Sequence, residues 1–411
     1  MFGIYVHIPF CEKKCIYCDF YSIERTEHIA SFVDLLCNEI TFRSKHSNNL
    51  PSATSVFFGG GTPSLLSPEQ LGLIITTIRE NFVINNDAEW TMECNPGTVT
   101  HESLCGYREL GINRLSFGVQ SFNESELAFL HRIHSPFQAE EAITLARKAG
   151  FDNVNLDVMF ALPLQTMDSW KFTLEKVIAL APEHISAYSL IFEEGTPLFT
   201  MLQRGSVDKA PEENDAEMYE YAIKRLAKSG YRQYEVSNFA QNDRECIHNC
   251  TYWSGDEYVA FGPSAHGLIN GKRYWNFRSL TRYTDIVADG ELPVANSEFL
   301  SDAERMFERA FLELRAKGIR LEEFRSDFGI DISHALGNEL ELWMREGLIE
   351  QSNGRLRLTA SGYLMCDELS LRSIAALEKT AGTEWQERVF PEEEREPDEF
   401  TYALPVLQQQ R

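Results

Sequence analysis

The 411-residue sequence lacks the features of membrane and secreted proteins. No apolar run approaches the roughly 20 residues that a membrane-spanning helix needs. The segment that opens the sequence has neither a basic region nor a small-residue cleavage site, so we expect no signal peptide. These absences predict a cytoplasmic protein without an integral membrane segment.

Positive charge is also scarce. The chain has 38 Lys and Arg against 62 Asp and Glu, which gives a formal net charge of −24 at pH 7. A surface this acidic repels nucleic acid and anionic membranes unless basic residues gather locally. We therefore expect no nucleic-acid partner.

No repeat of fixed period is present; instead, short apolar segments alternate with segments of helical periodicity as far as residue 190. This alternation predicts an α/β fold with a parallel sheet, either doubly wound or curled into an incomplete (β/α)6 barrel. In both arrangements ligands bind at the carboxyl ends of the strands. The predicted strands are 3–8, 55–58, 89–94, 114–119, 153–158 and 184–190, and the predicted helices are 28–45, one from about 68, 100–110, 124–130, 138–149 and 168–180.

The pattern changes after residue 205. A charged helix (212–229) precedes an aromatic and glycine-rich stretch (246–277), and from 301 helices lead to a hairpin around 352–354 that is similar to a winged helix. The final stretch is acidic and is expected to be mobile or loosely docked. The predicted domains are a partial barrel (1–205), a barrel extension (206–298), a helical winged-helix-like domain (299–374) and an acidic tail (375–411).

Three of the nine cysteines, Cys11, Cys15 and Cys18, follow the first predicted strand with C-x₃-C-x₂-C spacing. Without a secretory signal, such cysteines are more typical of metal sites than of disulfides. Three thiolates on one loop can bind three irons of a [4Fe–4S] cluster and leave the fourth iron open. A zinc site would need a second cysteine pair, and a c-type haem site would need histidine where Asp19 stands. A redox pair formed by Cys15 and Cys18 leaves Cys11 unexplained.

This cysteine pattern, placed after the first strand of a βα series, resembles the radical SAM superfamily. Several further segments resemble the oxygen-independent coproporphyrinogen III oxidase-like family more closely, and the likeness runs from about residue 3 to 372. It implies a [4Fe–4S] cluster on the three cysteines, with S-adenosylmethionine on the open iron and an electron donor for the cluster. The segments are Tyr5–Cys11, Cys18–Ser22, Phe58–Ser64, Glu93–Pro96, Arg114–Phe122, Leu130–Ser135 and Asn155–Pro163.

The resemblance also implies which residues bind S-adenosylmethionine. Glycines at the end of a strand allow close backbone approach to a ligand, and carboxylates at strand ends can accept hydrogen bonds from its ammonium group or ribose. The implied residues are Tyr5, Gly60, Gly61, Thr62, Glu93, Gln120, Arg132 and Asp157. The sequence departs from the family pattern at His131, Ala161 and Leu164, where relatives commonly have glycine.

The family has two main branches, a coproporphyrinogen III dehydrogenase and a HemW-type haem chaperone. The dehydrogenase pattern has a further cysteine where this chain has Phe20, whereas the chaperone pattern His-Asn-x-x-Tyr-Trp is present at 248–253. Histidine is a common axial haem ligand, and aromatic rings pack on a porphyrin face. The implied haem-binding residues are His248, Tyr252 and Trp253. The alternative is structural, with His248 capping a loop and Trp253 in the core; His7, His134 and His266 are alternative ligands.

We therefore expect a haem chaperone that has a [4Fe–4S] cluster, binds S-adenosylmethionine, and transfers haem to acceptor proteins. The alternative is a dehydrogenase that decarboxylates coproporphyrinogen III by radical chemistry. A radical SAM enzyme acting on tRNA is a third hypothesis, and the acidic charge argues against it.

Overall fold

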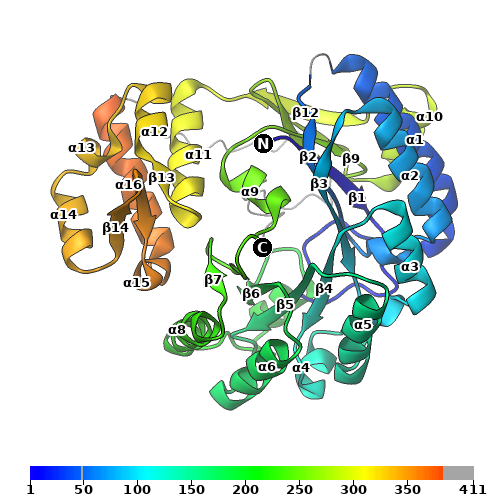
Figure 1. Cartoon of the computed structure of the whole chain (residues 1–411), viewed down its shortest axis with the longest axis horizontal. Coiled ribbons are helices and arrows are strands. Elements are labelled where there is room, and N and C mark those ends of the chain that lie inside the picture. Colours follow the sequence, from blue (N-terminus) through cyan, green and yellow to red (C-terminus); the bar gives the residue numbers. More distant parts are fainter. Residues whose placement is uncertain (48–49, 383–411) are drawn as a thin grey trace.

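The computed structural model describes residues 1–47 and 50–382, and its centre is a parallel sheet. The first six strands pair in chain order, and a later strand, β9, pairs in parallel with β1 on its other side (Figure 1). The parallel strands are β1 (Gly3–Ile8), β2 (Ala53–Gly60), β3 (Ile84–Cys94), β4 (Arg114–Gln120), β5 (Val154–Phe160), β6 (His184–Ser189) and β9 (Tyr258–Phe261).

Helices connect these strands and cover the outer, convex face of the curved sheet (Figure 1). The sheet is therefore an incomplete barrel, which resolves the choice between the two predicted architectures. Local signals set the helix ends: Ser67 and Gln70 form a capping box before α2, and Gly111 ends α3 with φ 102°. The connecting helices are α1 (Ile29–His46), α2 (Pro68–Asn81), α3 (His101–Leu110), α4 (Glu124–Phe129), α5 (Pro136–Lys148) and α6 (Met167–Ala179).

Side chains alternate between the two faces of the parallel strands. On β3, Trp90 and Met92 belong to the main apolar core, while Glu93, on the opposite face, points into the barrel interior. On β4, Leu115 and Phe117 belong to that core. The interior of the barrel is consequently polar at the height where the strands end.

The segment after β6 extends the sheet at both edges. Strand β8 runs antiparallel to β6, and three antiparallel strands continue beyond β9 on the other side. These elements are α7 (Pro197–Gln203), α8 (Glu212–Lys228), β7 (Arg232–Gln233), β8 (Asn238–Ala240), α9 (Ile247–Trp253), β10 (His266–Ile269), β11 (Lys272–Asn276), α10 (Leu280–Ala288) and β12 (Val294–Phe299). The complete order is β12-β11-β10-β9-β1-β2-β3-β4-β5-β6-β8-β7.

A helical domain with a small sheet follows, as predicted. Its hairpin turns at Asn353 and Gly354, which both have positive φ, the backbone that a two-residue hairpin turn requires. The sheet order is β13-β15-β14. The elements are α11 (Asp302–Arg315), β13 (Ile319–Arg320), α12 (Leu321–Phe328), α13 (Ile332–Leu336), α14 (Asn338–Arg345), β14 (Ile349–Ser352), β15 (Arg355–Leu358), α15 (Ala360–Tyr363) and α16 (Cys366–Ala381).

Two predicted features differ from the structure. Helix α16 continues to Ala381 with Leu377 fully buried, so residues 375–381 are part of a packed helix and not of a tail. The rest of the predicted tail, 383–411, lies outside the described residues. The predicted boundary at 298 falls inside β12, whereas the one at 205 falls between α7 and α8. None of the described helices has both the length and the apolar composition for crossing a membrane.

Candidate functional site

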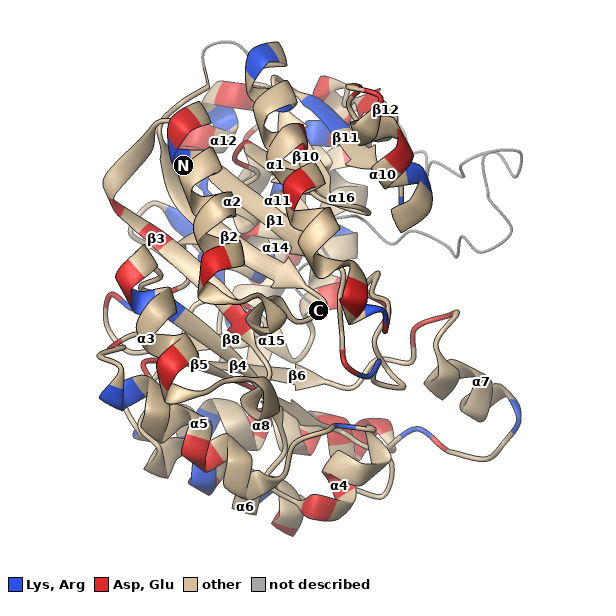
Figure 2. Cartoon of the chain, turned by 90° about the vertical axis from the view of Figure 1, so that its right-hand side faces the viewer, with Lys and Arg blue, Asp and Glu red and all other residues tan. Residues whose placement is uncertain are grey.

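The loop between β1 and α1, residues 9–22, presents the three clustered cysteines. Its two ends are joined by hydrogen bonds from the Cys11 N–H to the Ile23 carbonyl (3.0 Å) and from the Ile23 N–H to the Pro9 carbonyl (2.8 Å). Ile16 anchors its middle in a small apolar cluster, and the Leu198 N–H of α7 donates to the Ile16 carbonyl at 2.9 Å. Figure 2 shows α7 projecting from the body of the molecule beyond the end of β6. The loop is thus held in place from both sides.

Two side chains contact the cysteine sulfurs. The Thr62 hydroxyl donates to Cys11 Sγ at 3.5 Å, and Nη1 of Arg132 donates to Cys15 Sγ at 3.3 Å. The second Nη of Arg132 donates to the Gly118 carbonyl at 2.5 Å, which fixes the guanidinium beside the loop.

The donor set fits a cluster better than a single ion. In the described part of the chain, no three His, Cys, Asp or Glu side chains are placed to hold one metal ion. A [4Fe–4S] cluster has no such requirement, because each cysteine binds a different iron. The nine cysteines are all free of disulfides, so Cys11, Cys15 and Cys18 are all available.

The loop after β2 lies directly against the cysteine loop. The Gly61 N–H donates to the Ile8 carbonyl at 2.8 Å, and the Thr62 N–H donates to the Phe10 carbonyl at 2.7 Å. A Cβ on Gly61 would lie 2.6 Å from the Phe10 carbonyl oxygen, closer than any side chain can approach. Gly60 has φ 106°, a conformation that glycine adopts without strain. Both glycines are therefore required for the two loops to meet.

A cavity opens at the carboxyl ends of the strands, and it contains about 1320 Å³ of space that protein atoms do not fill, including its open mouth. The cavity includes Cys18 and all but one of the residues expected to bind S-adenosylmethionine. Those that line it are Gly60, Gly61, Thr62, Glu93, Gln120, Arg132 and Asp157.

Two carboxyl groups, Glu93 and Asp157, give the cavity its electrostatic character. Glu93 accepts from the Gly60 N–H at 3.1 Å, and Asp157 accepts from Ser116 (3.2 Å) and Asn155 (2.7 Å). Burial, together with the negative charge of Asp157, raises the pKa of Glu93 to about 8. Burial also raises the pKa of Asp157. A cation in the cavity would favour the ionised form of both groups, so the site is suited to a positively charged ligand.

Tyr5, the remaining expected residue, does not line the cavity. Its hydroxyl is hydrogen-bonded to His7 Nδ1 at 3.1 Å, and its ring stacks on Phe57 and His248 with centroids 6.3 Å apart in each case. Tyr5 is instead buried in a small cluster with Ala260, Ala265 and Phe57. The expectation that it contacts S-adenosylmethionine therefore finds no support in its position.

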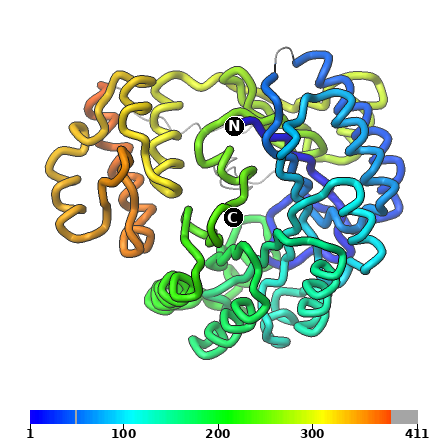
Figure 3. Tube along the Cα trace, viewed as in Figure 1, coloured from blue at the N-terminus to red at the C-terminus, as the bar shows by residue number. Residues whose placement is uncertain are grey.

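The expected haem-binding residues lie on α9, between the barrel and the C-terminal domain (Figure 3). His248 is only 1% exposed, and both its ring nitrogens are engaged, Nδ1 with Ser55 Oγ (2.9 Å) and Nε2 with the Tyr252 hydroxyl (2.8 Å). Burial lowers the pKa of His248 to about 3, so the ring is neutral. Trp253 is buried in a cluster with Phe311 of α11. In this conformation the three side chains have structural contacts, and His248 has no free nitrogen for a metal.

The alternative histidine ligands are buried as well. Both ring nitrogens of His7 are hydrogen-bonded, Nε2 of His134 is hydrogen-bonded to the Val119 carbonyl, and His266 stacks on Trp275. Burial lowers the pKa of each of these imidazoles. None of them lines the cavity.

Several cavity residues were not expected from the sequence. The period-two alternation of strand residues could have identified those on β4, β5 and β6, because polar side chains at alternate positions face the barrel interior. Asn249 gives no such signal, because the sequence did not indicate that residues 247–253 form a helix beside the barrel. Among the unexpected residues are Arg114, Ser116, Asn155, Tyr188 and Asn249.

The positions where the sequence departs from the family pattern share one backbone property. His131, Ala161 and Leu164 have φ of 58°, 56° and 62°, in the left-handed region that glycine adopts most readily. The glycines common in relatives are thus explained by conformation. This chain keeps the same turns with side chains, at a cost of about 1 kcal/mol at each position.

Two family models match this chain, one in the barrel and one in the C-terminal domain. Residues 5–177 match the radical SAM superfamily model, and residues 300–365 match the HemN C-terminal domain model. "Heme chaperone HemW" of Bacillus subtilis is 35% identical over 373 residues, covering 90% of this chain and 98% of its own. "Radical S-adenosyl methionine domain-containing protein 1, mitochondrial" of Bos taurus is 32% identical over 401 residues, covering 94% and 89%.

The structure of coproporphyrinogen III oxidase (HemN) from Escherichia coli has the same fold, with a TM-score of 0.77, 24% identity, and coverage of 90% of this chain and 89% of that one. At this identity the likeness concerns the fold alone. The family follows from the matches along nearly the whole sequence. The chain belongs to the radical SAM superfamily, and within it to the HemW-type members of the coproporphyrinogen III oxidase-like family.

Proposed function

We propose that the protein is a cytoplasmic haem chaperone that has a [4Fe–4S] cluster, binds S-adenosylmethionine, and transfers haem to acceptor proteins. The observation that supports this most is the likeness to curated haem chaperones over about nine-tenths of the chain. The His-Asn-x-x-Tyr-Trp motif at 248–253 and the absence of a cysteine at Phe20 agree with it.

In this proposal Cys11, Cys15 and Cys18 hold the cluster. With S-adenosylmethionine on the open iron and an electron donor, a centre of this kind supplies one-electron reductive chemistry. The chain's own residues bind and orient the ligand. The backbone at Gly60 and Gly61 leaves room for its methionine part, and the carboxyl of Glu93 accepts from its ammonium group.

Asp157 and Arg132 have complementary roles. Asp157 is held by Ser116 and Asn155 with its carboxyl in the cavity, where it accepts from ribose hydroxyls. Arg132 donates to Cys15 Sγ and keeps a positive charge beside the cysteine loop.

Haem ligation by His248 requires that α9 move away from its present contacts with the barrel. The imidazole is enclosed, and both nitrogens are hydrogen-bonded to Ser55 and Tyr252. Each neutral hydrogen bond contributes about 1 kcal/mol, so breaking both costs about 2 kcal/mol, which haem binding must exceed. Tyr252 and Trp253 lie on the same helix and would be exposed with it, available to pack on the porphyrin.

A coproporphyrinogen III dehydrogenase is the second candidate. It is favoured by the cavity at the strand ends, which has room for catalysis beside the cysteine loop, in a fold shared with the Escherichia coli enzyme. Phe20 counts against it, because this side chain lines the cavity where the dehydrogenase pattern has cysteine.

An anaerobic haem titration of the cluster-reconstituted protein, followed by Soret absorbance, tests the proposal. We expect saturable binding near one haem per chain, weakened in His248→Ala and unchanged in His334→Ala, whose histidine is exposed on α13. Equal affinity in His248→Ala and the wild type would refute the ligand assignment. No saturable binding would refute the chaperone, and release of carbon dioxide from coproporphyrinogen III would then support the dehydrogenase.

A further inference from the structure

Helix α9 places two consecutive residues in different surroundings. His248 is enclosed between Ser55 of β2 and Tyr252, whereas Asn249 lines the cavity at the strand ends. The carboxamide of Asn249 has both donors and an acceptor, and it shares this cavity with the carboxyl groups of Glu93 and Asp157.

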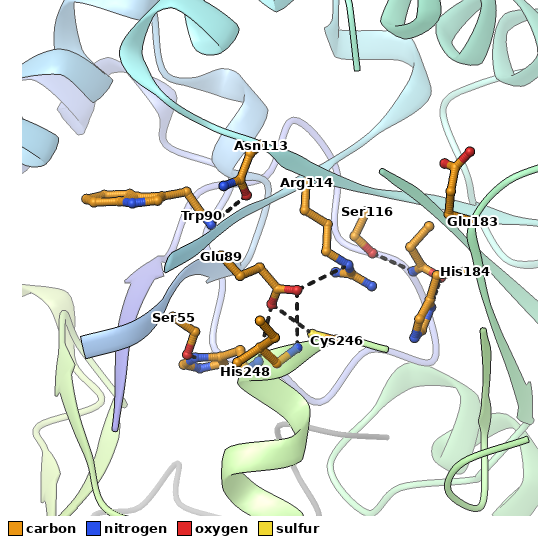
Figure 4. Close-up of polar contacts among 12 residues, drawn as sticks. Ser55, Glu89, Trp90, Asn113, Arg114, Ser116, Glu183, His184, Cys246 and His248 are labelled. Atoms are coloured by element: carbon orange, nitrogen blue, oxygen red, sulfur yellow. Dashed lines mark hydrogen bonds and ion pairs between the residues drawn. The ribbon is translucent and has the colours of Figure 1, made fainter. Parts of the chain in front are cut away.

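Glu89 of β3 fixes the start of α9 (Figure 4). Its carboxylate accepts from the backbone N–H groups of Ile247 (3.1 Å) and His248 (3.2 Å) and from Cys246 Sγ (3.4 Å). Glu89 is 4% exposed, so its charge is shielded from water. Three contacts from the consecutive residues 246–248 thus depend on one buried carboxylate, and Arg114 Nε of β4 lies 3.9 Å from it.

Arg114 connects this carboxylate with the cavity. The guanidinium is 2% exposed and lines the cavity, and its positive charge counteracts the rise in pKa of Glu93 and of Asp157. One buried cation therefore stabilises both the carboxylate that seats α9 and the carboxyl groups that face a ligand. Figure 4 shows Glu89 between Arg114 and the first residues of α9.

We infer that Asn249 is a ligand-binding residue of the cavity, held there by Glu89 and Arg114 as positioning residues. When α9 is in the position seen in this structure, Asn249 completes the cavity wall that S-adenosylmethionine contacts. When α9 moves away from this position, His248 becomes able to bind haem and Asn249 leaves the cavity. S-adenosylmethionine and haem then oppose each other's binding by the same factor. This second part rests on the proposed haem function, whereas the place of Asn249 does not.

Equilibrium dialysis with labelled S-adenosylmethionine, on anaerobic cluster-reconstituted protein, tests the place of Asn249. We expect about tenfold weaker binding in Asn249→Ala and no change in Asn214→Ala, an exposed asparagine on α8. An unchanged cluster absorbance and circular dichroism spectrum identify a folded Asn249→Ala variant. Equal affinity of that folded variant and the wild type would overturn the assignment.

Haem titration with and without saturating S-adenosylmethionine tests the coupling. We expect the haem dissociation constant to rise at least fivefold when S-adenosylmethionine is present. Ser55→Ala removes one hydrogen bond from His248 without altering the cavity wall, and we expect it to tighten haem binding severalfold. Ser370→Ala, which removes a buried serine hydrogen bond on α16, is the matched control and should leave haem binding unchanged.

The outcomes separate the inference from the proposed function. Haem binding that is saturable but indifferent to S-adenosylmethionine and to Ser55→Ala would overturn the coupling and leave the chaperone in place. Absence of haem binding would overturn the chaperone and the coupling together, while the dialysis result would still decide the place of Asn249.

Discussion

The substitution Glu89→Gln tests the buried network in which Glu89 and Arg114 hold the start of α9 in place. Glutamine has nearly the same volume but no charge, and it keeps only one of the two carboxylate oxygens. One of the backbone donors at Ile247 and His248 then faces an amide NH₂ group, and Arg114 loses its nearest counter-charge.

The expected loss of stability follows from these contacts. Removing one partner of a buried ion pair typically costs about 3–5 kcal/mol. Arg114 keeps the nearby carboxyl groups of Asp157 and Glu93, and glutamine keeps one acceptor, so we expect the lower end, about 3 kcal/mol. Glu175→Gln is the matched control, because Glu175 accepts two hydrogen bonds from Arg225 at the surface. Exposed pairs contribute less than about 1 kcal/mol.

Two measurements check this expectation. Urea unfolding of the anaerobic, cluster-reconstituted variants, followed by far-UV circular dichroism, gives the loss of stability. Hydrogen–deuterium exchange of peptides that cover 247–253 reports the opening of α9 itself, and it should accelerate in Glu89→Gln but not in Glu175→Gln. A stability within 0.5 kcal/mol of the wild type, or unchanged exchange in 247–253, would refute the reasoning about the network.

Three further predictions concern single residues. Burial raises the pKa of Glu235 to about 8, so between about pH 4.3 and 8 the folded chain keeps a proton that the unfolded chain has lost. The free energy of unfolding therefore falls as pH rises, and Glu235→Gln should reduce that fall by up to about 1.4 kcal/mol per pH unit. An equal change in the urea midpoint from pH 6 to pH 8 in the wild type and the variant would contradict this. Leu164 is fully exposed at φ 62°, so Leu164→Gly should relieve about 1 kcal/mol of backbone strain and, after the entropy of glycine, gain about 0.5 kcal/mol; a lower urea midpoint would count against it. Gly61→Ala would force a Cβ against the Phe10 carbonyl and should weaken S-adenosylmethionine binding at least tenfold, whereas Gly72→Ala, which meets only a leucine side chain, should leave binding unchanged.

Much of the fold was predictable because its signals are local. The alternation of strands and amphipathic helices predicted a parallel sheet of six βα units, and the cysteine spacing predicted a loop able to hold a cluster; the strand order β1 to β6 came from the structure. Helix α9 was missed, because its seven residues are set by Glu89, which lies 157 residues before Cys246. The end of α16 was misplaced because the charged sequence after residue 378 obscured a helix whose Leu377 is buried.

By itself, the sequence determined the features that neighbouring residues specify: the cysteine loop, the strand-end glycines, and the turns in which His131 and Leu164 take positive φ. Only the tertiary structure decided which side chains share the cavity and that both nitrogens of His248 are hydrogen-bonded. The reason is that these properties depend on partners from distant segments; Ser55, for example, meets His248 across 193 residues. Burial by these distant segments shifts the pKa values of groups such as His248 and encloses α9. A linear motif specifies neither effect.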